Sequence, residues 1–131
     1  IDDDALREAL ECSGVQRFLA TIPGGIQAVL ADRGQSLSTG QRQAIALARA
    51  LSARPEVLLL DESTAALDLN SEQDFVKRID DCMYTTLILV THRLPMLELV
   101  DRIIILAEGR IAIDGPRDDV LAKLKAGKKN E

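Results

Sequence analysis

Two polar segments of the chain could act on a phosphorylated ligand. The first is Leu37-Ser38-Thr39-Gly40-Gln41, which opens a helical pattern, and the second is Asp61-Glu62, which follows the apolar run Val57–Leu60. A helix start has unpaired backbone N–H groups and a partial positive charge, so it can bind an anion. Two carboxylates at the end of a buried strand can hold Mg²⁺ and position a water molecule.

The first segment also has a purely structural explanation. Ser38 and Gln41 match a capping box, in which each side chain pairs with a free backbone N–H group of the first helical turn. Gly40 would let a ligand approach the backbone closely, and Ser38 adds a hydroxyl donor. Taken alone, the segment fits a structural helix cap better than an anion site.

His92 strengthens the case that Asp61-Glu62 is a functional site. Asp61 could hold Mg²⁺ through water, while Glu62 could orient or deprotonate an attacking water. His92 follows a second apolar run, Thr86–Val90, and would reach the same sheet edge if both strands are parallel. There an imidazole could contact a γ-phosphate and the water. The alternatives are an exposed acidic pair and a structural histidine; Asp68 is either part of this site or an ordinary turn or cap residue.

Composition narrows the class of protein. The chain has 131 residues and 47% hydrophobic content, enough for one domain with a core. A net charge of -5 and 2% aromatic content disfavour a nucleic-acid binder. Cys12 and Cys82 share no short spacing, so we expect two reduced thiols and no zinc site. No apolar run is long enough to span a membrane, and the acidic N-terminus does not resemble a signal peptide, so we expect this chain to be soluble and cytoplasmic. The sequence begins without Met, so we expect it to be a piece of a longer protein.

Hydrophobic periodicity predicts alternating helices and strands, and therefore an α/β layered fold with a parallel sheet. The expected helices are Asp2–Ala20 (interrupted at Ser13-Gly14), Ile26–Asp32, Ser38–Ala53, Ser71–Asp81, Pro95–Leu99 and Pro116–Leu124. The expected strands are Val57–Leu60 and Thr86–Val90, both covered on two faces, and the hairpin Ile103–Leu106 with Arg110–Ile113. We expect the tail Lys125–Glu131 to be solvated.

The combined pattern resembles the C-terminal part of an ABC transporter ATPase domain, a P-loop NTPase-like fold. Leu37–Gln43 is similar to the signature motif of that family, Val57–Asp61 to its Walker B strand, Ala65–Asp68 to its D-loop, and His92 to its switch histidine. Asp32-Arg33-Gly34 and Val90-Thr91-His92-Arg93 are similar to exporters. The stretch Leu97–Gly115 looks closest to type I secretion ATPases.

This resemblance implies ATP and Mg²⁺ as ligands and ATP hydrolysis as the activity of the complete protein. Glu62 and His92 would be catalytic and Asp61 would hold the metal. Ser38, Thr39, Gly40 and Gln41 would bind nucleotide in trans, in a head-to-tail dimer with a second ATPase domain. Asp68 would be the aspartate of the D-loop. The transmembrane domain of the exporter would be the other partner, at the cytoplasmic face of the inner membrane.

The sequence also departs from the family. Thr39 stands where the family usually has Gly, and no G-x-x-x-x-G-K-[S/T] phosphate loop occurs in the chain. We therefore expect residues 1–36 to be part of a helical subdomain, 37–124 the signature helix and the C-terminal part of the ATPase core, and 125–131 a flexible tail. We expect this chain to be inactive alone, with exposed apolar surface where part of the sheet is missing.

Two other classes compete with an exporter. Chromosome-maintenance and DNA-repair ATPases also carry signature and Walker B motifs in a C-terminal lobe, but a coiled coil should then precede the lobe, and 1–20 shows only one interrupted helix. A non-catalytic regulatory domain of the same family is the other alternative, and the presence of Glu62 and His92 argues against it.

Overall fold

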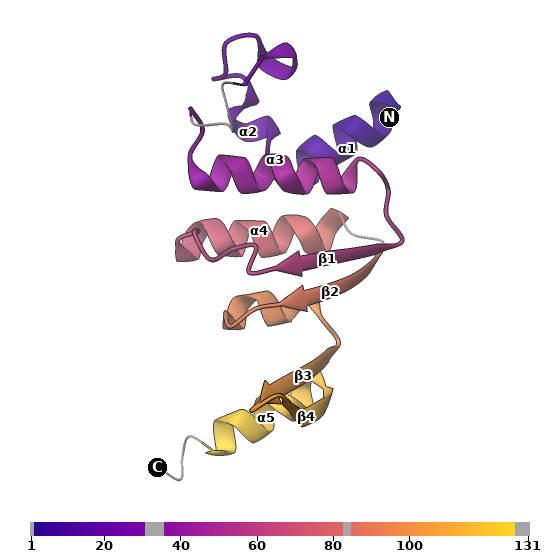
Figure 1. The fold of residues 1–131 in the computed structure, drawn as a ribbon, viewed down its shortest axis with the longest axis vertical. Helices are drawn as coiled ribbons and strands as arrows, with labels where there is room; N and C mark the ends of the chain where they lie inside the picture. The colour runs from indigo at the N-terminus through magenta and orange to yellow at the C-terminus, as the bar shows by residue number, and fades with distance from the viewer. Residues whose placement is uncertain (1, 31–35, 83–84, 128–131) are drawn as a thin grey trace. The chain divides into compact units, whose positions relative to one another are not determined.

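The computed structural model describes residues 2–30, 36–82 and 85–127, and the chain divides into two compact units, residues 1–92 and residues 93–131 (Figure 1). The mixed helix and strand content agrees with the predicted α/β class. Asp32-Arg33-Gly34 lies outside the described residues.

The first unit opens with α1 (Asp3–Ser13) and α2 (Gln16–Leu19). The side chain of Asp2 accepts a hydrogen bond from the Ala5 N–H group at 2.6 Å and so caps α1. Gly14 ends the helix in the left-handed conformation at φ 81, with its N–H group bonded to Glu11 O. The interruption predicted at Ser13-Gly14 is therefore confirmed, as a true break between two helices.

The helix predicted over Ile26–Asp32 is wrong in its described part. A 3-10 turn, η1 (Gly25–Gln27), occupies its start, and Ala28 is already extended. Ile26 and Val29 are both exposed, Val29 almost completely at 97%. A short helix needs a packed apolar face, and none forms here.

A parallel pair of strands forms the centre of this unit. After α3 (Thr39–Leu51) the chain forms β1 (Val57–Asp61), α4 (Leu69–Cys82) and β2 (Thr86–Val90). The two strands are parallel, with Asp61 opposite Val90 at their carboxyl ends. Helix α1 packs against both α3 and α4, and Figure 1 shows α3 and α4 running alongside β1. The buried core includes Leu47, Leu58, Leu60, Phe75 and Ile79.

The prediction that both faces of these strands are covered is wrong for the part of the chain described. Leu58 and Leu60 are buried, but Leu59 on the other face is 63% exposed and Ile88 opposite it is 51% exposed. Side chains alternate between the two faces of a strand, so the described elements cover one face only.

The expectation of two reduced cysteines is also wrong. Cys12 at the end of α1 and Cys82 at the end of α4 form a disulfide, with their Cα atoms 5.8 Å apart. The two residues are 70 positions apart in sequence. Their pairing follows from the packing of α1 against α4, which no local sequence pattern encodes.

The second unit is a hairpin with helical flanks. It contains η3 (Leu94–Leu99), β3 (Arg102–Ala107), β4 (Arg110–Pro116) and α5 (Arg117–Gly127). The predicted antiparallel hairpin is confirmed, and α5 extends beyond the predicted end at Leu124. Met96 and Val120 are its most buried apolar side chains. Among the described residues, no helix is both long and apolar enough to cross a membrane.

Candidate functional site

The start of α3 has the predicted capping box. Ser38 Oγ accepts a hydrogen bond from the Gln41 N–H group at 3.1 Å, and the Ser38 N–H group donates to Gln41 Oε1 at 2.9 Å. A hydroxyl that accepts one bond can still donate its own hydrogen. The structural role of Ser38 is therefore compatible with an additional bond from its hydroxyl to an anion.

Arg42 forms hydrogen bonds to the residues on both sides of the N-cap Ser38. Its guanidinium donates to Leu37 O at 3.2 Å and to Thr39 Oγ1 at 3.1 Å. The Thr39 hydroxyl oxygen is thus engaged within α3. Sequence reasoning did not assign this role to Arg42, although its spacing of three residues from Thr39 is the spacing that brings helical side chains together.

Gly40 faces the loop that precedes α4. A Cβ atom at this position would lie 3.4 Å from Leu67 Cδ2, at the short end of ordinary van der Waals contact. The missing side chain at Gly40 therefore permits close packing of α3 against the segment Ala65–Asp68.

The predicted meeting of Glu62 and His92 is present at the carboxyl ends of β1 and β2. His92 Nδ1 lies 2.9 Å from Glu62 Oε1. The backbone of Glu62 is fixed as well, because its N–H group donates to Val90 O at 2.9 Å. Glu62 adopts a φ of 47, in the left-handed region where residues other than glycine are uncommon.

The second carboxylate oxygen of Glu62 has different surroundings. Glu62 Oε2 is buried and has no hydrogen-bond partner among the described residues, and the same holds for Gln43 Oε1 and Ser63 Oγ. Buried polar atoms are normally paired, by protein or by water. These unpaired atoms fit a site that takes up water or a polar ligand.

Asp68 acts as a helix cap, one of the two roles that the sequence left open. Asp68 Oδ1 accepts from the Ser71 N–H group and Oδ2 accepts from the Ser71 hydroxyl, both at 2.9 Å. These two bonds, the backbone bond first, lower the pKa of the Asp68 carboxyl below its ordinary value.

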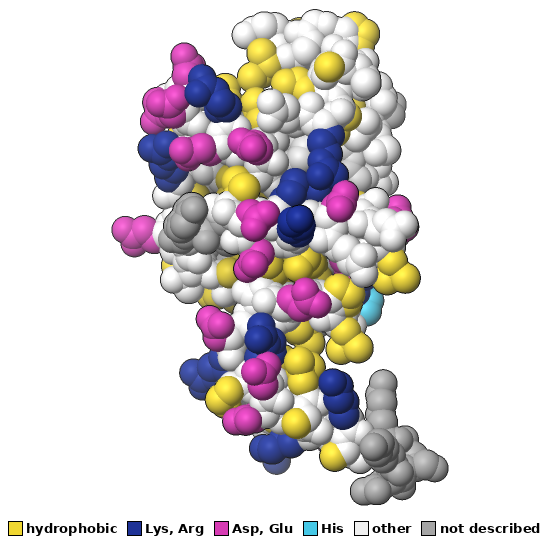
Figure 2. Space-filling view, turned by 180° about the vertical axis from the view of Figure 1, so that it is seen from behind, with side chains coloured by type: hydrophobic (Ala, Val, Ile, Leu, Met, Phe, Trp, Pro, Cys, Tyr) yellow, Lys and Arg dark blue, Asp and Glu magenta, His cyan; other side chains and the backbone are white. Residues whose placement is uncertain are grey.

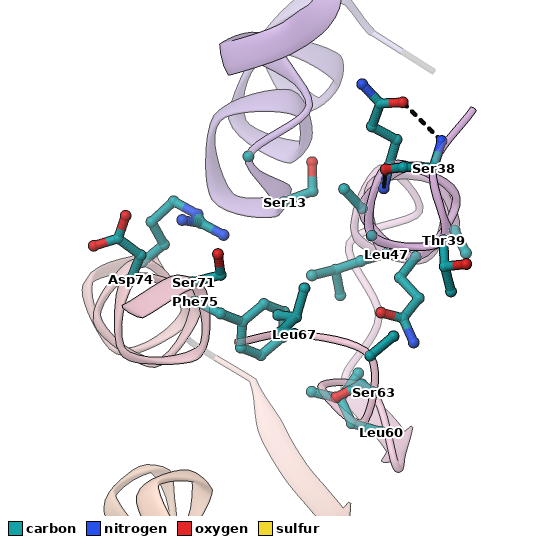
Figure 3. Close-up of a pocket in the computed structure, with 18 of the residues that line it drawn as sticks. Ser13, Ser38, Thr39, Leu47, Leu60, Ser63, Leu67, Ser71, Asp74 and Phe75 are labelled. Atoms are coloured by element: carbon teal, nitrogen blue, oxygen red, sulfur yellow. Dashed lines mark hydrogen bonds between the residues drawn. The ribbon is translucent and has the colours of Figure 1, made fainter. Parts of the chain in front are cut away.

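A cavity of about 740 Å³ brings several predicted residues together (Figure 3). Its wall includes the N-cap Ser38, then Thr39, Gly40 and Gln41 from α3, Asp61 from β1 and Asp68 before α4. Glu62 and His92 are not part of this wall. The structure therefore places the metal-ligand candidate Asp61 with the α3 residues, and the catalytic candidates at the adjoining strand ends.

Two further residues of this cavity were not predicted as site residues, namely Gln43 and Ser63. Gln43 follows Thr39 by four positions, so it lies on the same helical face, and Ser63 directly follows Asp61-Glu62. Both signals were readable from the sequence.

The residues present fit a magnesium nucleotide. Mg²⁺ is held in proteins by one or two carboxylates together with water and substrate phosphate oxygens. Asp61 is an exposed carboxylate on the cavity wall, and no cluster of three or more His, Cys, Asp or Glu ligands occurs in the described residues. A single exposed carboxylate suits an ion that obtains its other ligands from water and from the phosphate oxygens of its nucleotide.

Comparison with known proteins finds similarity to ABC transporters. The sequence pattern of the ABC transporter family matches residues 7–65. The chain is 42% identical over 106 residues to an ATP-dependent lipid A-core flippase of Methylobacillus flagellatus, covering 80% of this chain and 18% of the flippase. It is 40% identical over 115 residues to the cyclolysin secretion/processing ATP-binding protein CyaB of Bordetella pertussis, covering 87% of this chain and 16% of CyaB.

The chain is also similar in structure to an ABC exporter. A bacterial Atm1-family ABC exporter with ATP bound superposes with a TM-score of 0.79 at 33% identity, over 93% of this chain and 22% of the exporter chain. The chain thus spans about a fifth of the length of these relatives.

Proposed function

We propose that this chain, which is similar to exporter-type ATPase domains of the ABC transporter family, is part of a protein that binds and hydrolyses ATP to drive export. The observation that carries this proposal is the pair formed by Glu62 and His92 at the ends of two parallel strands. A carboxylate with one oxygen held and the other unpaired is suited to accept a proton from water.

We assign the steps of hydrolysis to side chains as follows. Glu62 Oε2 accepts the proton of the attacking water, while His92 holds Glu62 Oε1 and keeps the carboxylate oriented. Asp61 would hold Mg²⁺, which when bound would supply positive charge to offset the negative charge of the phosphate oxygens. Catalysis in this scheme is positioning combined with electrostatic stabilisation.

We propose that the start of α3 serves a second ATPase domain. Ser38, Thr39, Gly40 and Gln41 would contact the nucleotide held by the partner, using the Ser38 hydroxyl and the partial positive charge of the helix start. Asp68 would lie at the same dimer interface, next to Gly40 through Leu67. The sequence holds no phosphate loop of its own, so we expect the 131-residue chain to be inactive alone.

We propose a transport partner and a location by analogy with the relatives. CyaB is a secretion protein, and the protein of Methylobacillus flagellatus is a lipid flippase. We therefore propose that the complete protein acts together with a transmembrane domain, at the cytoplasmic face of the inner membrane. Type I protein secretion is the specific case we favour, because of the stretch Leu97–Gly115 and the similarity to CyaB. These relatives are transport proteins, which leaves the chromosome-maintenance alternative without support.

The test is Mg-ATP turnover by the longer protein that contains this chain. Glu62→Gln should lower the rate by about 10²–10⁴ while ATP binding is retained, because only the general base is lost. Glu56→Gln is the matched control, since Glu56 is an exposed glutamate at the opposite end of β1. Normal turnover in Glu62→Gln would refute the assignment of the base.

A further inference from the structure

A fully buried polar pair lies next to the proposed catalytic loop. Thr64 is 1% exposed and Glu72, in the first turn of α4, is 0% exposed. Thr64 Oγ1 donates a hydrogen bond to Glu72 Oε1 at 2.8 Å. Burying a carboxylate costs free energy unless it is hydrogen-bonded, so this bond is important to the arrangement.

The pair is connected to Glu62 by a short, hydrogen-bonded backbone. Thr64 is two residues after Glu62, and the Ala65 N–H group donates to Glu62 O at 3.1 Å. The Leu67 N–H group donates to Thr64 O at 2.9 Å, which closes a second turn that starts at Thr64 and overlaps the first. A side-chain bond that fixes Thr64 therefore also restrains the backbone from which Glu62 projects.

The conformation of Glu62 requires such restraint. A non-glycine residue in the left-handed region, here at φ 47, persists only when its surroundings determine it. On one side the Glu62 N–H group is bonded to Val90 O. On the other side the backbone is held by the bond from the Ala65 N–H group to Glu62 O and by the buried side-chain bond between Thr64 and Glu72.

We propose that Glu72 is a positioning residue, which acts through Thr64 to hold Glu62 in the orientation that pairs it with His92. Glu72 is itself buried and lies outside the wall of the cavity, so it does not touch the nucleotide. This inference deepens the proposed function and rests on it for its catalytic meaning, but its structural part can be tested without ATP.

The test uses the side chain of His92, the one histidine of the sequence. An ionised carboxylate can only accept, so Glu62 favours the neutral tautomer with the proton on Nδ1. Nitrogen-15 NMR of the 131-residue chain reports this tautomer directly. Thr64→Val removes the donor at nearly constant shape, and the ratio of Nδ1–H to Nε2–H tautomer should fall roughly tenfold, as for the loss of one hydrogen bond.

Two variants serve as controls. Thr64→Ser keeps the hydroxyl and should keep the wild-type ratio. Asp74 is on the same helix as Glu72 and forms an exposed ion pair with Arg17 of α2, at 2.8 Å. Asp74→Asn removes this ion pair and should also leave the ratio unchanged. A wild-type ratio in folded Thr64→Val, or an equal change in Asp74→Asn, would overturn the proposal. Failure of Thr64→Val to fold while Thr64→Ser folds would also count against it, because the bond would then serve folding.

The catalytic part is tested in the longer protein. Thr64→Val and Glu72→Ala should each lower kcat roughly tenfold with little change in KM for ATP, and Thr64→Ser should restore kcat. Neither variant should lower the residual rate further in a Glu62→Gln background, since residues that act through one group are not additive. Additive losses would overturn the inference alone, whereas normal turnover in Glu62→Gln would refute the proposed base and leave the NMR result standing.

Discussion

Glu62 and Asp68 lie in the same loop, but their carboxylates differ in how many oxygens are already hydrogen-bonded. Both oxygens of Asp68 are engaged by Ser71, and these bonds lower its pKa. Glu62 has one oxygen paired with His92 and the other buried and unpaired. At the scale of residues, this difference makes Glu62 the better candidate for accepting a proton.

Gly14 offers a test of local packing. Its φ is 81, and a Cβ atom there would lie 3.0 Å from the Arg78 guanidinium. We expect Gly14→Ala to lower the free energy of unfolding by roughly 1–2 kcal/mol, the cost of a left-handed conformation for a residue with a side chain. Urea denaturation of the chain measures the change. Gly127→Ala is the control, since a Cβ there meets nothing within 4 Å, and an equal loss in both variants would contradict the argument.

Several residues of the site could be predicted because their signals are local. The capping box of Ser38 and Gln41 depends on a spacing within one helical turn. The meeting of Glu62 with His92 required only the assumption that two apolar strands are parallel. The bond between Thr64 and Glu72 could not be predicted, because it depends on how the loop folds back onto α4.

At the scale of elements, helix caps make stability depend on pH. The pKa of Asp2 is lowered by its bond from the Ala5 N–H group, and the pKa of Asp68 by its bonds from Ser71. A group whose pKa is lowered by folding stabilises the fold above its unfolded pKa, about 3.9 for Asp, and loses this contribution as the pH falls further.

We therefore expect the free energy of unfolding to be constant near neutral pH and to decrease below about pH 4. Asp68→Asn keeps a good capping residue without a titrating group, so the variant should lose less stability on acidification than the wild type. Urea denaturation at several pH values measures both slopes. Identical slopes would exclude Asp68 as a source of the pH dependence.

The disulfide gives a second prediction for the elements, because Cys12 and Cys82 join the ends of α1 and α4. Reduction should lower the free energy of unfolding by roughly 2–4 kcal/mol, as for disulfides that close long loops. Thermal melting with and without reductant tests this. Cys12→Ser should melt like the reduced chain under both conditions, and a wild-type chain insensitive to reductant would show that the bond does not form.

Periodicity predicted most helices and strands, and its failures have a common cause. The hairpin and the parallel strands were marked by their own apolar patterns. The helix expected over Ile26–Asp32 and the two-sided cover of β1 and β2 both assumed tertiary contacts. A sequence pattern shows which side chains could be buried, but the described part of the chain supplies no surface to bury these against.

For the chain as a whole, the uncovered face of the parallel strands predicts self-association. Leu59 and Ile88 lie side by side on this face and are both more than half exposed. In the space-filling view of Figure 2, acidic and basic side chains are mixed, and hydrophobic side chains lie between them. Exposed apolar surface favours association, so the sedimentation coefficient of the chain should rise with concentration.

Leu59→Thr with Ile88→Thr should reduce this association, because threonine is tolerated in strands and is less apolar. Val29→Thr is the control, since Val29 is exposed but lies outside the sheet. Analytical ultracentrifugation over a range of concentrations distinguishes the variants. Association that is unchanged in the double variant would show that another surface is responsible.

The central claim is that Glu62 and Ser38 of one chain serve two different ATP sites, and mixing two inactive proteins tests it most directly. The longer protein would be made with Ser38→Arg or with Glu62→Gln, and Mg-ATP turnover measured for each alone and after the two are mixed and allowed to exchange partners. We predict that each alone keeps only a small residual rate and that the mixture recovers turnover, because a mixed dimer contains one site with both residues intact. A mixture as inactive as its components would contradict the account.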